Sequence, residues 1–119
     1  MQRNQRADAA GFRPATFNKV FRWTQEQPGD APTLVEVAGT FSNWERYPLW
    51  YNETSSVWQL TIEGIPGNRT HTYMIFVDGQ PANDKTADGL AIPQTLPEKQ
   101  HQFMTPRGPR VFLLYSQTK

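Results

Sequence analysis

Hydrophobic and polar positions alternate with a period of two along much of the chain, and this alternation predicts β-strands. In VWQLTI, residues 57–62, Trp58 and Leu60 share one face and Gln59 lies on the other. The same alternation predicts strands at residues 16–24, 33–39 and 69–79. The segment at 69–79 ends in Asp78-Gly79, which is a strong signal for a tight turn.

Shorter extended segments are expected at residues 47–51, 101–104 and 110–115, with Pro48 indicating an edge strand. Residues 80–99 have little periodicity and are expected to be irregular. Ten prolines and eight glycines interrupt the chain, and no segment has a convincing helical pattern. The pattern therefore predicts an all-β protein, a β-sandwich of about seven short strands.

The predicted strands divide the chain into three parts: a basic N-terminal tail at 1–14, the sandwich at 15–105, and a C-terminal segment at 106–119. The last part contains VFLLY, residues 111–115, which is the most apolar stretch of the chain. We interpret it as an extension or an added strand, apolar enough to pair with a strand of a neighbouring protein.

Composition excludes several classes of function. A net charge of +1 over 119 residues does not favour nucleic-acid binding, and the absence of Cys excludes disulfides and thiolate metal sites. No apolar run reaches membrane-spanning length. We expect one domain without a transmembrane segment and without a cofactor or bound metal.

The N-terminal tail has no apolar central segment of the kind that a secretory signal requires. Its Arg3, Arg6 and Arg13 are similar in composition to an organellar targeting segment, although a solvated basic tail is favoured. The expected location is intracellular, soluble or peripheral, with an organelle such as the mitochondrion as the alternative.

Five segments resemble carbohydrate-binding module family 48 in their order and spacing: VFRWT, VEVAGTFSNW, YPLW, VWQLTIEGIPG and HTYMIFVDGQ. The resemblance covers residues 20–84 and is greatest to the glycogen-binding domain of the AMP-activated protein kinase beta subunit. Its most specific parts are the Gly-x-Phe-x-x-Trp turn at residues 39–44 and the Tyr-x-x-Phe-Val-Asp-Gly segment at residues 73–79.

The resemblance implies an early-set immunoglobulin-like sandwich that binds α-glucan and has no catalytic activity. Trp44 matches the family's first sugar-stacking tryptophan, and Asn43 precedes it in the same turn. Met74, however, stands where the kinase-type members have a lysine, and Pro81 stands where they have a second tryptophan. The resemblance therefore implies a degenerate glucan site.

Alternation places Met74 and Phe76 on the outer face of their strand, beside Trp44. Trp50 alternates outward from Leu49, either as a second sugar-binding ring or as cover for an interface. A surface of tryptophan, methionine and phenylalanine is more typical of protein interfaces than of sugar sites, which pair aromatic rings with hydrogen-bonding groups. The predicted surface therefore comprises Asn43, Trp44, Trp50, Met74 and Phe76.

An enzyme is not expected, because His71 and His101 have no metal-ligand spacing and no catalytic constellation is evident. His71, Trp23 and Trp58 are interpreted as structural residues. The favoured hypothesis is a non-catalytic accessory subunit that binds other protein subunits. The alternative is a functional α-glucan-binding module that uses Trp44 and Trp50.

Overall fold

The computed structural model describes residues 15–26 and 28–117. The basic tail expected at 1–14 therefore lies outside the described residues. The first half of the chain forms β1 (Thr16–Trp23), β2 (Val35–Gly39), the 3-10 turn η1 (Thr40–Ser42), β3 (Tyr47–Pro48), β4 (Trp50–Asn52) and β5 (Val57–Pro66). The second half forms β6 (Thr70–Val77), β7 (Gln80–Ala82), β8 (Gly89–Ala91), α1 (Leu96–His101), β9 (Phe103–Thr105) and β10 (Gly108–Tyr115).

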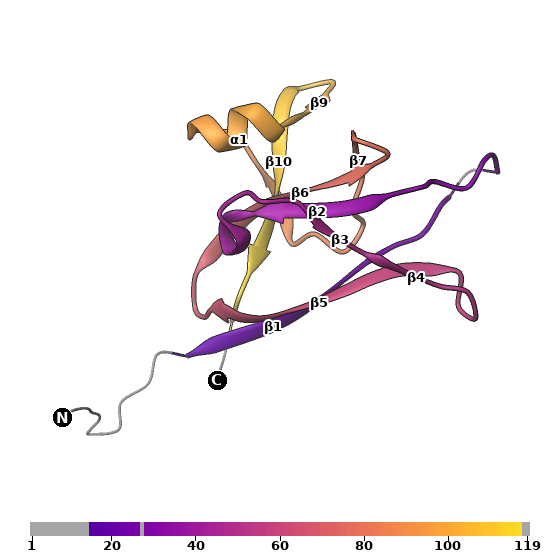
Figure 1. Cartoon of the computed structure of the whole chain (residues 1–119). Helices are drawn as coiled ribbons and strands as arrows, with labels where there is room; N and C mark the ends of the chain where they lie inside the picture. The colour runs from indigo at the N-terminus through magenta and orange to yellow at the C-terminus, as the bar shows by residue number, and fades with distance from the viewer. Residues whose placement is uncertain (1–14, 27, 118–119) are drawn as a thin grey trace.

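The strands form two antiparallel sheets that pack face to face (Figure 1). The smaller sheet has the order β1-β5-β4, and the larger has the order β3-β2-β6-β10-β8, with β7 paired to β6 and β9 paired to β10. The chain crosses from the larger sheet to the smaller one between β3 and β4, at the buried Leu49. This is an all-β, immunoglobulin-like sandwich, which confirms the predicted fold class.

The core lies between the sheets and is rich in aromatic rings. Phe21 of β1 packs edge-on against Tyr73 of β6 at 5.1 Å between ring centroids, and Tyr73 contacts Phe112 of β10 at 5.5 Å. These three side chains are buried because period-2 alternation turns them towards the facing sheet. The Tyr73 hydroxyl donates to the buried Asp84 carboxylate at 2.6 Å, which ties residues 80–88 to the sheet.

Helix α1 lies on the other face of the larger sheet, opposite the side that packs on β1 and β5 (Figure 1). It begins with a capping box, in which the Thr95 side chain accepts from Glu98 N and the Glu98 side chain accepts from Thr95 N. Pro97 occupies the first turn, where a missing N–H is tolerated. The Thr-x-x-Glu motif thus indicates the start of a helix that the hydrophobic periodicity does not indicate.

Two sequence-based expectations need correction. Residues 80–99 contain β7, β8 and most of α1, although no helix was predicted. The C-terminal segment is integral to the sandwich, because β10 pairs with β6 on one side and with β8 on the other. Its Val111 and Phe112 are buried within this chain, so they need no strand of a neighbouring protein to cover them.

Candidate functional site

The turn after β2 holds Trp44 in an unusual backbone conformation. Asn43 and Trp44 both have positive φ, at 53° and 63°. A left-handed backbone is rare for a bulky residue and costs on the order of 1 kcal/mol. The turn is closed by a 2.8 Å hydrogen bond from Trp44 N to Gly39 O and by one from Glu45 N to Ser42 O. The local sequence thus fixes the direction in which the indole points.

The indole of Trp44 is half-buried against α1. Its ring stacks on the imidazole of His101, with centroids 5.0 Å apart and planes 30° apart. His101 also packs edge-on against Phe76, and its Nδ1 lies 2.8 Å from Pro97 O. One face of the indole is therefore in contact with a side chain of the same protein.

Glu98 attaches α1 to the larger sheet. Its carboxylate accepts from the Thr72 hydroxyl of β6 at 2.7 Å and from Gln94 N at 2.8 Å. Burial alone would raise the pKa of Glu98, but hydrogen bonds from Gln94, Thr72 and Thr95 outweigh it and hold the pKa below its ordinary value of 4.5. The folded protein therefore favours the ionised form of this carboxyl.

We expect Glu98→Gln to weaken the docking of α1 and to lower the free energy of unfolding by about 1 kcal/mol. Because the folded pKa is the lower one, the contribution of Glu98 is complete above pH 4.5 and is lost as the pH falls through the folded value. In the unmodified protein, the indole N–H signal of Trp44, followed by NMR from pH 7 to pH 3, should shift as the pH falls below 4.5. The Glu98→Gln variant should lack this shift. The matched control is Glu53→Gln, at an exposed glutamate, which should keep the shift. Equal shifts at low pH in the two variants would contradict the role of Glu98 in attaching α1.

Met74 and Phe76 do not lie on an exposed surface, which corrects the prediction made from alternation. Both do project from the outer face of β6, but they are buried. Phe76 is covered by His101 and by the Arg46 guanidinium, which lies 3.9 Å from its ring centroid. The outer face of a sheet is solvent-exposed only where nothing packs on it, and here α1 packs on it through His101 and Glu98.

Trp50 is the most exposed aromatic residue in the described part of the chain, at 71% of its surface. It lies on β4 opposite Gln59, whereas Trp44 packs on the far side of the larger sheet. The two tryptophans therefore do not form one flat surface. Asn43 is exposed beside Trp44, where it ends η1.

Trp50 borders an apolar hollow at the edge of the sandwich. This hollow, of about 440 Å3, is lined by Tyr47 and Pro48 of β3 and by Leu60 and Ile62 of β5. It forms where the chain leaves one sheet for the other, so that the inner face of β5 is not fully covered. We call Tyr47, Pro48 and Trp50 the Trp50 edge.

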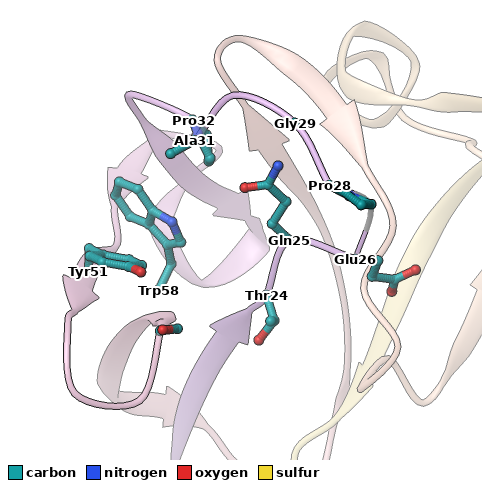
Figure 2. A pocket seen from close by; sticks show the side chains of 10 residues that line it. Thr24, Gln25, Glu26, Pro28, Gly29, Ala31, Pro32, Tyr51 and Trp58 are labelled. Atoms are coloured by element: carbon teal, nitrogen blue, oxygen red, sulfur yellow. The ribbon is translucent and has the colours of Figure 1, made fainter.

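A second pocket, of about 620 Å3, lies at the open end of the sandwich and was not predicted. Trp58 and Tyr51 pack against each other at one side of it, and the loop between β1 and β2 forms the other side (Figure 2). Trp58 is thus half-buried: it packs against the core, as expected, and it also lines this pocket. Alternation identifies its face correctly, but the facing sheet does not extend far enough to cover it.

The described residues show no catalytic arrangement. His71 bridges the Thr40 hydroxyl and Pro66 O, which is a structural role. In the parts of the chain that the structure describes, no three His, Asp or Glu side chains gather as metal ligands. Within the same residues, no helix is long and apolar enough to cross a membrane.

Neither the comparison with protein families nor that with curated proteins finds a match for this chain.

Proposed function

We propose that this protein is a non-catalytic interaction module, an accessory subunit of a larger protein assembly, built on a family-48-like sandwich. Its ancestral glucan site is degenerate. The Trp50 edge contacts the partner protein.

The observation that carries this proposal is the stacking of His101 on Trp44. A glucan-binding ring must offer a free face to the pyranose C–H groups, and α1 occupies one face of this ring. The lysine that the family places beside it is replaced by Met74, which is fully buried. The residue at the position of the sugar-binding lysine has thus become part of the protein interior.

The Trp50 edge has the composition of a protein interface. Tryptophan and tyrosine are enriched at interface hot spots because a large ring buries much area at little cost in conformational entropy. Trp50 and Tyr47 are exposed beside a hollow lined by Leu60 and Ile62, into which an apolar partner side chain fits. An exposed tryptophan beside an unfilled apolar hollow supports the proposal that a partner protein covers this edge.

We expect Trp50→Ala to weaken partner binding about thirtyfold, as for an interface hot spot of about 2 kcal/mol. The free energy of unfolding should change by less than about 0.5 kcal/mol, because the side chain is largely exposed. A photo-crosslinking amino acid at position 50, introduced in the native cells, identifies the partner. The same amino acid at Met104, which is 70% exposed on β9, is the matched control.

A discrete adduct that forms at position 50, is absent at position 104, and is competed by the unmodified protein but not by the Trp50→Ala protein supports the proposal. A monomer that forms no adduct at position 50 contradicts it. Titration with maltoheptaose tests the alternative function directly. Saturable binding that disappears in Trp44→Ala would establish a functional glucan site and overturn the proposal of a degenerate one.

A further inference from the structure

The pocket at the open end of the sandwich has an aromatic wall. Tyr51 of β4 and Trp58 of β5 are cross-strand partners, with ring centroids 5.3 Å apart and planes 52° apart. Tyr51 is 49% exposed and Trp58 is half-buried, so the pair offers an outer ring and a deeper one. Because the two rings are tilted, they do not form one flat surface (Figure 2).

The lining of this pocket is electrically neutral. The one acidic side chain among its lining residues is Glu26, which is paired with Lys85 at 3.1 Å and points away from the two rings (Figure 2). The lining includes no basic residue. A phosphorylated, nucleic-acid or strongly charged ligand therefore finds no counter-charge here, and a neutral ligand is favoured.

The deeper ring carries a hydrogen-bond donor, the indole N–H of Trp58. Among the residues that the structure describes, none accepts a hydrogen bond from the indole N–H of Trp58. In Figure 2 this nitrogen lies on the ring edge that faces Gln25, across the pocket. Because this donor faces the pocket, a ligand bound there can accept a hydrogen bond from it.

We infer that this pocket binds a proline-rich segment of a partner protein in the polyproline II conformation. The inference rests on the proposed function and names the chemistry of a second contact. Proline rings pack on Tyr51 and Trp58, and a backbone carbonyl of the ligand accepts from the Trp58 indole. A polyproline II segment has solvated carbonyls and few N–H groups, so it supplies the acceptor that a donor-only indole needs.

A sugar is the competing neutral ligand, and the polar groups of the pocket favour it less. The amide of Gln25 donates within its own loop, to Asp30 O at 3.3 Å. The hydroxyls of Thr24 and Ser56 also line the pocket, and both belong to exposed residues. Sugar recognition requires several donors and acceptors around the stacked ring, whereas the aromatic wall of this pocket offers only the Trp58 indole N–H and the Tyr51 hydroxyl.

The test uses the full chain, labelled with 15N, and uncharged decapeptides: decaproline, peptides with a Pro-x-x-Pro core, and a Gly-Ser peptide as the negative control. We expect the proline-rich peptides to shift the Trp58 indole N–H signal in a saturable way. Trp58→Phe keeps a ring but removes the donor, and should weaken binding about tenfold, measured for this variant from the backbone amide signals of residues 51 and 58. Tyr51→Ala should weaken it further, and Trp50→Ala should leave it unchanged. Thermal unfolding of each variant verifies the fold.

Binding should change less than about twofold when salt is raised, because no ion pair is expected. Saturable shifts of the Trp58 signal by maltoheptaose and not by the peptides would overturn the inference in favour of a sugar site. The absence of any shift with the proline-rich peptides would also overturn the inference. In that case a Trp50-dependent adduct in the same protein would still support the proposed function. Peptide binding without that adduct would instead remove the Trp50 edge from the proposal.

Discussion

Met74→Lys, which restores the lysine of the resembled family, should lower the free energy of unfolding by about 3–5 kcal/mol instead of creating a glucan site. Met74 is fully buried between β2 and α1, opposite Ala38. An ammonium group at this position must either remain unpaired in an apolar layer or displace α1. Small domains have a total stability of about 5–15 kcal/mol, so the loss is a large fraction of it. Chemical denaturation followed by circular dichroism measures it.

Met74→Leu is the matched control for this substitution. A volume-conserving apolar change should cost less than about 1.5 kcal/mol. A Met74→Lys protein that unfolds at the same midpoint as the unmodified chain and gains affinity for maltoheptaose would show that this face of β6 is open. That result would contradict both the covering role of α1 and the proposal that the glucan site is degenerate.

Gly39→Ala should lower the free energy of unfolding by about 3 kcal/mol, because the added methyl group has no room. A Cβ at this position lies 2.7 Å from Thr72 O and 2.7 Å from Tyr73 Cβ. The φ of Gly39 is −169°, which any residue adopts, so the effect is purely steric. The carbonyl belongs to the central strand β6 and moves only with the sheet. Thermal and denaturant unfolding measure the loss.

Gly64→Ala separates this clash from the general effect of losing a glycine. Its added Cβ meets no atom within 4 Å, but its φ of +73° favours glycine by about 1 kcal/mol. We therefore expect a smaller loss at Gly64 than at Gly39. Equal losses at the two positions would show that β2 and β6 can separate at the start of the Trp44 turn.

The main strands could be predicted because each carries its own alternation. In residues 57–62 the pattern alone identifies the faces of Trp58 and Gln59, and the ladder with β1 and β4 agrees with it. The short strands β7, β8 and β9 have three residues each, too few for a period to show. Helix α1 has six residues and rests on its capping box and on contacts with the sheet, so a periodicity search misses it.

The candidate site was harder to predict because exposure depends on segments distant in sequence. The position of Trp44 after its turn follows from residues 39–44, but its stacking on His101 does not. Met74 is buried because a helix more than twenty residues later covers it. Conversely, Trp58 has a clear inward pattern yet lines a pocket, because the facing sheet ends before reaching it.

The position of β10 has a consequence for synthesis of the protein. Although β10 is the last strand in the described chain, it lies inside the larger sheet, between β6 and β8. Until residues 108–115 have left the ribosome, the first half of β6 therefore has no partner on that edge, and Phe112 is missing from the core. Pairing between segments so far apart in sequence is slow and leaves an open strand edge in the meantime. We therefore expect nascent chains to depend on chaperones until residues 108–115 have left the ribosome.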